Sequence, residues 1–201
     1  MKRILSILIF LLLCSPSYGM NVVMMSGEGT STAGETGTET IGNETAGDSV
    51  SSINSSYIYC GKVTELPAHN GSVNSVTVSF HKGTATNGEV HIAIYTHDSG
   101  NDIPANLVAN SGTGAIAITN STPVSDYTHT YTGTKPTVSS GTQYWICFQA
   151  AAANEVDYGS TETGGRRSLC TLDTYGSWPA TLSNQGTAAT LFGKLYFVNG
   201  Y

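Results

Sequence analysis

Three cysteines lie beyond residue 19, and Cys147 has the most distinctive surroundings of the three. It lies in GTQYWICFQA (residues 141–150), the most apolar stretch of that part of the chain. A reactive thiolate needs an electropositive neighbour, and no basic residue adjoins Cys147 in this stretch. A nucleophile is therefore the least favoured role, whereas a disulfide and a buried thiol both stay open. Any two of Cys60, Cys147 and Cys170 could pair, and we take Cys170 as the first candidate partner of Cys147.

Aromatic and basic side chains that could bind a sugar occur near the C-terminal end. Trp178 and Tyr175 lie in the glycine-containing segment TYGSWPATL (residues 174–182), and Arg166 and Arg167 precede it. Aromatic rings in a loop can stack on a sugar ring, and guanidinium groups can hydrogen-bond to its hydroxyls. These four residues are our candidate ligand-binding set. The alternative is that Trp178 is a loop aromatic that caps one end of the domain.

The loop THDSGNDIP (residues 96–104) supplies three oxygen-bearing side chains, those of Asp98, Asn101 and Asp102. Carboxylate and amide oxygens are calcium ligands, so this loop is our candidate metal site. Its spacing differs from that of an EF-hand, and an Asp/Asn/Gly turn explains the same residues without an ion. We expect no cofactor, with a structural calcium ion in this loop as the alternative.

Catalysis has little support in the sequence. Glycoside hydrolysis needs two carboxylates beside a cleft, and Glu155 and Asp157 would share a face if they lie on one strand. Two solvated acids at a strand end explain the pair more simply. The G-x-S-x-G motif of serine hydrolases does not occur. We therefore expect that the chain is not an enzyme, and we predict no catalytic residues.

The elements that must position these residues are β-strands. Apolar and polar residues alternate over residues 73–80 and 89–96, and similar short stretches recur up to residue 198, with Gly, Asn and Asp between them. In residues 141–150, alternation places Tyr144, Ile146 and Phe148 on one face of a strand, and Trp145 and Cys147 on the other. The pattern predicts an all-β fold over residues 41–201: a single jelly-roll-like β-sandwich of about eight to ten antiparallel strands.

Residues 1–40 differ from this domain. Two basic residues, an apolar run over residues 4–13 and small residues at Ser17 and Gly19 predict a signal peptide over residues 1–19. Lipidation at Cys14 is less favoured, because Leu13 is larger than the residue that such a site prefers. Residues 20–40 are rich in Thr, Gly, Ser and Glu, which predicts a flexible acidic arm. Its apolar segment NVVMM (residues 21–25) is either the remnant of an apolar leader or a strand that docks on another subunit.

The charge of the chain limits its partners. Removal of a signal peptide that carries Lys2 and Arg3 lowers the net charge from −6 to −8. Such a chain is poorly suited to nucleic acid and to anionic membranes, and residues 4–13 are too short to span a bilayer. We expect a secreted protein, extracellular or on a cell surface. Its expected partners are a polysaccharide or other glycan, or further copies of itself.

Longer sequence patterns carry a resemblance. The order VNSVTVSFHKG, GEVHIAIYTHDSGNDIPANLVANSG, TVSSGTQYWICFQA and YGSWPATL resembles a recurrent β-sandwich module of bacterial surface proteins and of phage tail and receptor-binding proteins. The resemblance covers about residues 41–201. It implies a jelly-roll-like domain that attaches or binds, often to carbohydrate, and it brings no catalytic residues. The chain departs from the pattern in holding one module with no enzyme beside it.

Three functions follow from these observations, in order of preference. The first is a secreted, non-catalytic surface or attachment module that binds carbohydrate. The second is a structural subunit of an extracellular fibre or filament, assembled through the N-terminal arm, because a short apolar strand can extend the sheet edge of a neighbour. The third is a small secreted hydrolase.

Overall fold

The computed structural model describes most of the chain from residue 36 onwards. The described residues are 36–47, 49–81, 88–119, 124–152, 154–158, 166–172, 174–182, 184–188 and 192–201, without the side chains of residues 81, 154–158, 184, 185 and 188. Residues 34–201 form one compact unit. The expected signal peptide over residues 1–19 and most of the expected arm over residues 20–40 lie outside the described residues.

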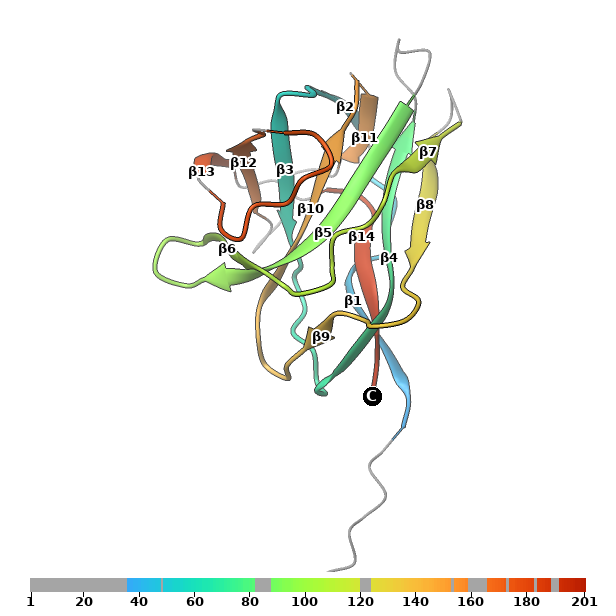
Figure 1. Ribbon diagram of the computed structural model, residues 1–201, viewed down its shortest axis with the longest axis vertical. Helices are drawn as coiled ribbons and strands as arrows, with labels where there is room; N and C mark the ends of the chain where they lie inside the picture. The colour runs from blue at the N-terminus through green and yellow to red at the C-terminus, as the bar shows by residue number, and fades with distance from the viewer. Residues whose placement is uncertain are drawn as a thin grey trace, which may run out of the picture. The chain divides into compact units, whose positions relative to one another are not determined.

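Two antiparallel sheets make up this unit, which confirms the all-β sandwich (Figure 1). Sheet A consists of β1 (Thr38–Asn43), β2 (Ser49–Ile53), β4 (Gly71–His81), β8 (Ser125–Thr130), β9 (Thr137–Val138), β11 (Asn154–Tyr158) and β14 (Leu195–Gly200). Sheet B consists of β3 (Tyr57–Lys62), β5 (Gly88–Asp98), β6 (Ile103–Leu107), β7 (Ile116–Ile118), β10 (Tyr144–Ala150), β12 (Arg167–Thr171) and β13 (Asn184–Ala188).

The described residues therefore contain 14 strands, more than the eight to ten that the sequence predicts. Part of the excess comes from very short strands. β7 has three residues and β9 has two, which is too few for alternation to be recognised in the sequence. The long strands lie where the sequence places them, since β4 contains residues 73–80 and β5 contains residues 89–96.

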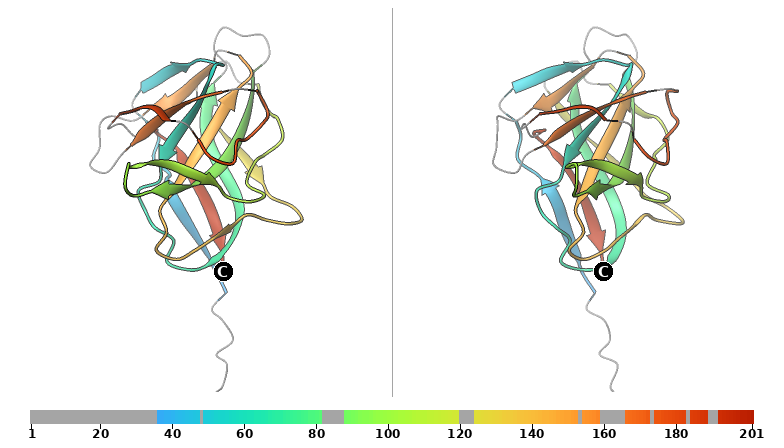
Figure 2. Two further views of the ribbon diagram at one scale, coloured as in Figure 1. Left: turned by 60° about the vertical axis from the view of Figure 1, so that its left-hand side comes forward. Right: turned by 90° about the vertical axis from the view of Figure 1, so that its left-hand side faces the viewer.

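The order of the strands follows from their pairing. In sheet A, β14 pairs with β1 and β4, and β11 pairs with β4 and β2. The strand β4 also pairs with β8 and β9. In sheet B the order is β13-β12-β3-β10-β5-β6, with β7 also on β5. Figure 2 shows the same arrangement of strands from two further directions.

The main core fills the space between the sheets. The inward residues of β4, which are Val76, Val78 and Phe80, pack in one buried cluster with Ile146 and Phe148 of β10. A smaller buried cluster lies on the other face of sheet B and contains Trp145 and Cys147. The predicted alternation of β10 is therefore confirmed, but both of its faces are buried, because residues 174–182 cover the outer face of sheet B.

The ordered domain begins before residue 41. Glu39 of β1 accepts hydrogen bonds from the backbone N–H groups of Ala68 (3.0 Å) and His69 (3.2 Å) and from Asn199 Nδ2 (2.8 Å). Gly37 pairs with Tyr201 through two backbone hydrogen bonds of 2.8 and 3.1 Å. These contacts fix β1 against β14, so the strand begins at Thr38, three residues before the expected start of the domain at residue 41.

The predicted disulfide partner of Cys147 is wrong. Cys147 of β10 lies directly opposite Cys60 of β3 in the strand register, with 4.0 Å between their Cα atoms, and these two residues form the disulfide. Cys170 is a buried free thiol on β12, where it lies opposite Ile58 rather than Cys60. Strand register, which the sequence does not encode locally, decides the pairing. The disulfide is consistent with an oxidising environment such as the extracellular space.

In the part of the chain that the structure describes, no helix has the length and hydrophobicity needed to cross a bilayer.

Candidate functional site

A cleft opens between the sheets where β2 of sheet A lies near β3, β12 and β13 of sheet B. Its volume is about 340 Å³, and the described residues that line it are Ser52, Tyr59, Arg167, Leu169, Gly186 and Thr187. A second hollow of about 440 Å³ shares Ser52 and Tyr59 with the first, and Ile53, Asn54 and Ser55 complete its described lining. Each volume lies within the range of about 300–1,000 Å³ typical of small-molecule sites.

Tyr59 is common to both hollows, and its ring is fixed in place. Successive residues of a strand point to opposite faces, so Tyr59 points inward while Ile58 and Cys60 join the outer cluster. Its ring stacks on Phe148 with centroids 5.7 Å apart and planes at 7°. Its hydroxyl oxygen accepts a hydrogen bond of 2.8 Å from the backbone N–H of Asn54. An aromatic ring that lines both hollows is therefore held in place before any ligand binds.

Arg167 enters the same cleft because of the register between β3 and β12. It lies opposite Gly61, and the next residue on the same face of β12, Leu169, lies opposite Tyr59. Arg167 and Tyr59 are thus diagonal neighbours on the inward face of the ladder. The half-buried Arg167 adds a guanidinium group, while Ser52 and Thr187 add hydroxyl groups from the two sides of the cleft.

The chemistry of this cleft suits a polyhydroxylated ligand. A fixed aromatic face can stack on the apolar face of a sugar ring, and the guanidinium, hydroxyl and backbone groups around it can hydrogen-bond to the sugar hydroxyls. Of the four residues that the sequence suggests as ligand-binding, Arg167 alone lines the cleft. Tyr59, Ser52 and Thr187 were not predicted, because they come from separate strands and no local pattern connects them.

Tyr175 and Trp178 lie elsewhere, in a segment that crosses the outer face of sheet B. We call residues 174–182 the strap, and Figure 1 shows it in orange-red in front of β3 and β10. Trp178 packs against the outer cluster, with its ring centroid 6.2 Å from that of Tyr95. Tyr175 meets the ring of His91 edge-on, with centroids 4.8 Å apart. Both aromatic residues are half-buried against strands of sheet B, so their placement matches a capping role better than an exposed sugar platform.

Polar contacts also hold the strap in place. The side-chain amide of Gln149 donates to Ser177 O (2.6 Å) and accepts from the backbone N–H of Gly176 (2.9 Å). The Tyr95 hydroxyl donates to Pro179 O at 2.6 Å. Gln149 is fully buried, so its hydrogen bonds to the strap satisfy polar atoms that water cannot reach.

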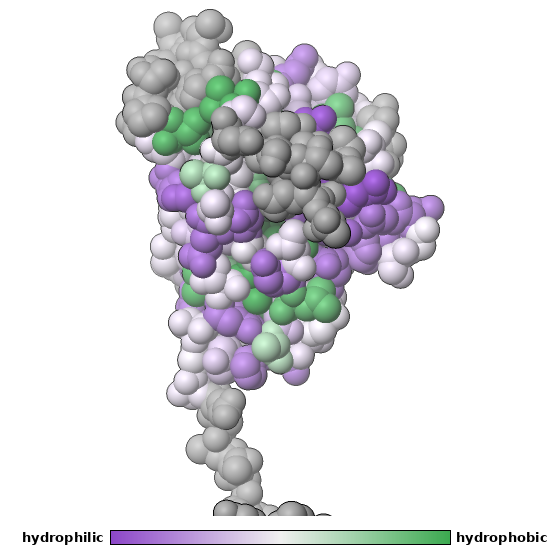
Figure 3. Space-filling model, turned by 180° about the vertical axis from the view of Figure 1, so that it is seen from behind, coloured by the Kyte–Doolittle hydropathy of each residue, from purple (hydrophilic) through white to green (hydrophobic). Residues whose placement is uncertain are grey.

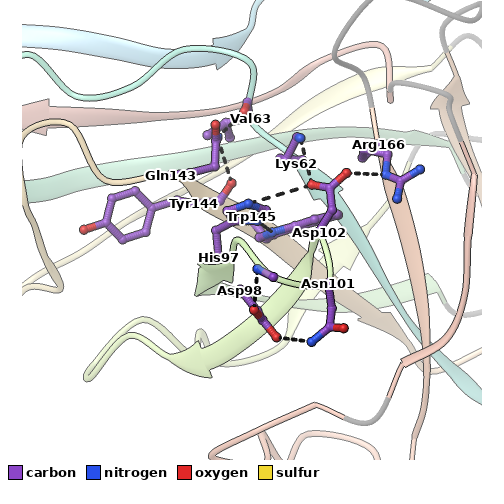
Figure 4. A network of polar contacts seen from close by, with 11 residues as sticks. Lys62, Val63, His97, Asp98, Asn101, Asp102, Gln143, Tyr144, Trp145 and Arg166 are labelled. Atoms are coloured by element: carbon purple, nitrogen blue, oxygen red, sulfur yellow. Dashed lines mark hydrogen bonds and ion pairs between the residues drawn. The ribbon is translucent and has the colours of Figure 1, made fainter.

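Arg166 belongs to a third region, an ionic network around Asp102 (Figure 4). Asp102 lies 2.9 Å from Lys62 Nζ through Oδ1 and 2.6 Å from Arg166 Nε through Oδ2. Burial acts to raise the pKa of Asp102, but the hydrogen bond from Lys62 and the charges of Lys62 and Arg166 outweigh it and hold that pKa below its usual value. Asp102 is therefore an anion between two cations.

His97 connects this network to the core. Trp145 Nε1 donates to His97 Nδ1 at 3.0 Å, which assigns the proton of a neutral imidazole to Nε2, 3.8 Å from Asp102 Oδ1. Burial and the nearby Lys62 lower the pKa of His97, although the charges of Asp102 and Asp98 oppose that change. His97 is thus favoured in its neutral form in the folded protein.

The three candidate calcium ligands are held by two different sets of protein contacts. Asp98 accepts hydrogen bonds from the backbone N–H of Gly100 (2.9 Å) and from Asn101 Nδ2 (2.8 Å), so these two residues close their own turn. Asp102 faces Lys62 and Arg166 instead (Figure 4). No group of three or more His, Cys, Asp or Glu side chains suited to a metal ion occurs among the described residues. The hydrogen bonds of Asp98 to Gly100 and Asn101 are those of an Asp/Asn/Gly turn.

We expect a pH dependence of stability from His97. Its folded-state pKa is lowered from about 6.5, so stability is complete above that pH and decreases as the pH falls through it, because the unfolded chain takes up the proton first. The variant His97→Gln keeps an acceptor for Trp145 and should show a shallower loss of stability between about pH 7 and pH 5. Urea unfolding at several pH values measures this slope. Equal slopes for the two proteins would contradict the assignment.

On the face shown in Figure 3, the described residues form no broad apolar patch that could serve as another ligand site. Apolar residues there form small groups among polar ones, seen from behind the view of Figure 1. Among the described residues, the large apolar side chains that are exposed are Val50 and Leu66.

Comparison with known proteins assigns no family to the chain. No model of a protein family matches the chain, and no curated protein is a significant match.

Proposed function

We propose that the chain is an exported, non-catalytic attachment module that binds carbohydrate in the cleft between β2 and strands β3, β12 and β13. The observation that carries this proposal is the fixed Tyr59 ring, which lines two adjoining hollows together with hydroxyl groups and Arg167. The resemblance of residues 41–201 to attachment modules supports the proposal. The Cys60–Cys147 disulfide also supports it, because disulfides are typical of exported proteins in an oxidising environment.

The residues of the cleft match the two kinds of surface that a sugar ring presents. A sugar ring has an apolar face and a hydroxylated rim, so its protein site needs an aromatic surface with donors and acceptors around it. Tyr59 supplies that surface, and Phe148 behind it prevents the ring from turning away. A preformed site avoids the entropic cost of ordering side chains when the ligand binds.

Tyr59→Leu should weaken carbohydrate binding at least about tenfold, because loss of one stacking surface costs about 1.4 kcal/mol or more. The measurement is affinity electrophoresis against a panel of neutral and acidic polysaccharides. Tyr127→Leu is the matched control. Tyr127 also packs on a core phenylalanine, with its ring centroid 6.4 Å from that of Phe80, and its hydroxyl also accepts from a backbone N–H, that of Thr119 at 3.1 Å.

The two variants distinguish binding from stability. Both remove a half-buried tyrosine, but Tyr127 does not line the cleft. If both variants bind as the parent does, or if the parent binds no polysaccharide in the panel, the proposal fails. Assembly into a fibre through residues 20–40 remains the second candidate, and most of that segment lies outside the described residues.

A further inference from the structure

We infer that the ligand of the Tyr59 cleft is an acidic saccharide, with its carboxylate bound by Arg167. This inference rests on the proposed function, since it names the sugar class that the same cleft takes. It depends on the charge of the residues that line the cleft. It also depends on the difference between the cleft, which is the first hollow, and the second hollow beside it.

The first argument is the character of the described lining. Arg167 is a cation, and the other described lining residues of both hollows are neutral. A guanidinium group matches a carboxylate in geometry, because two parallel N–H groups can donate to its two oxygens. Arg167 has a protein contact of its own, and a group with five N–H donors can keep such a contact and still bind a ligand carboxylate.

The second argument is the position of basic residues in an acidic chain. The net charge is −6, and the domain from residue 41 onwards carries Lys62, Lys82, Lys135, Arg166, Arg167 and Lys194 as its Lys and Arg residues. Three of these lie together at one end of the ladder between β3 and β12, where the backbone N–H of Lys62 donates to Arg166 O at 2.9 Å. Lys62 and Arg166 both pair with Asp102, whereas Arg167 is the one of the three that lines the cleft.

The third argument is the asymmetry of the two hollows about Tyr59. Arg167, Gly186 and Thr187 line the first hollow, whereas Asn54 and Ser55 line the second. The two together suit a chain of at least two sugar units that passes Tyr59. The acidic unit is expected in the first hollow, and a unit that needs only neutral hydrogen-bonding groups is expected in the second.

The dependence of binding on salt concentration distinguishes a direct contact with Arg167 from a diffuse surface attraction. The net negative charge of the protein repels an acidic polymer at long range, and that repulsion is screened beyond about 8 Å at 0.15 M ionic strength. The direct contact with the half-buried Arg167 is screened less. Binding should therefore persist at 0.15 M salt rather than disappear, as it would for a diffuse surface attraction.

The experiment compares acidic polymers with their neutral counterparts. Polygalacturonate, alginate and hyaluronate are each used beside the same polymer with its carboxylates reduced to alcohols. We expect at least one acidic polymer to bind, and its reduced form to bind at least tenfold more weakly. Arg167→Gln should reduce binding of the acidic form to the level of the reduced form, and Arg167→Lys should fall between the parent and Arg167→Gln.

The control is Lys135→Gln. Lys135 is also a cation, and its ammonium group donates to Asn74 Oδ1 at 2.7 Å. It does not line the cleft, so binding should be unchanged. Thermal unfolding confirms that each variant is folded. Equal binding of acidic and reduced polymers overturns the acidic preference and leaves the proposed function intact. Binding of neutral glycans alone also overturns the preference, and binding of no glycan overturns both proposals.

Discussion

Removal of the Cys60–Cys147 disulfide in the double variant Cys60→Ala/Cys147→Ala should lower the free energy of unfolding by about 4–5 kcal/mol. The bond joins residues 87 positions apart, so its loss releases a long loop in the unfolded chain. The whole stability of a domain is about 5–15 kcal/mol, so this loss is a large part of it. In thermal terms the expected decrease of Tm is about 10–15 °C for a domain of this size. Urea and thermal unfolding measure both quantities.

Cys170→Ala is the matched control for this experiment. Cys170 is also a buried cysteine in the outer cluster of sheet B, but it closes no loop. Its replacement should cost about 1 kcal/mol, the effect of removing one small buried group. A double variant no less stable than Cys170→Ala would show that the disulfide does not stabilise the protein by constraining the unfolded chain. Mass spectrometry of the parent after alkylation in denaturant without reduction should find Cys170 as the free thiol.

The faces of the strands could be predicted from the sequence, but the pairing between strands could not. Alternation in residues 144–148 correctly separates the residues of the main core from Trp145 and Cys147. Which strands lie beside β10 depends on the chain topology, and that choice decides whether Cys147 meets Cys60 or Cys170. A local pattern carries no information about register between strands that are far apart in the sequence.

The candidate ligand residues show the same limit. Arg166 and Arg167 are adjacent in the sequence, yet Arg166 pairs with Asp102 while Arg167 lines the cleft. Tyr59 has no sequence feature that distinguishes it from Tyr57 two residues earlier. Its role depends on Phe148 behind it and on strands β2 and β13 around it, which only the folded sandwich brings together. Residue types could suggest carbohydrate chemistry, but they could not select the site.

The second large effect on stability is expected from a substitution in the strap. Trp178→Ala should destabilise the protein by roughly 2 kcal/mol, less than the 3–5 kcal/mol of a fully buried aromatic residue, because Trp178 is only half-buried. Trp178 fits closely against its neighbours: a Cβ atom at Gly112 would lie 2.6 Å from Trp178 Cδ1. Loss of this ring weakens the hold of the strap on the outer face of sheet B, which it shields from solvent.

The specific consequence of a loosened strap is exposure of the Cys170 thiol. Cys170 belongs to the cluster against which Trp178 packs, and burial raises the pKa of its thiol, so it should react very slowly in the parent. Trp178→Ala should accelerate maleimide labelling of Cys170 under native conditions through local opening. Tyr127→Leu, which alters sheet A, should leave this local reaction unchanged below the unfolding transition. Equal labelling rates in Trp178→Ala and the parent would mean that the strap stays closed without its tryptophan, held by the hydrogen bonds of Gln149 and Tyr95 alone.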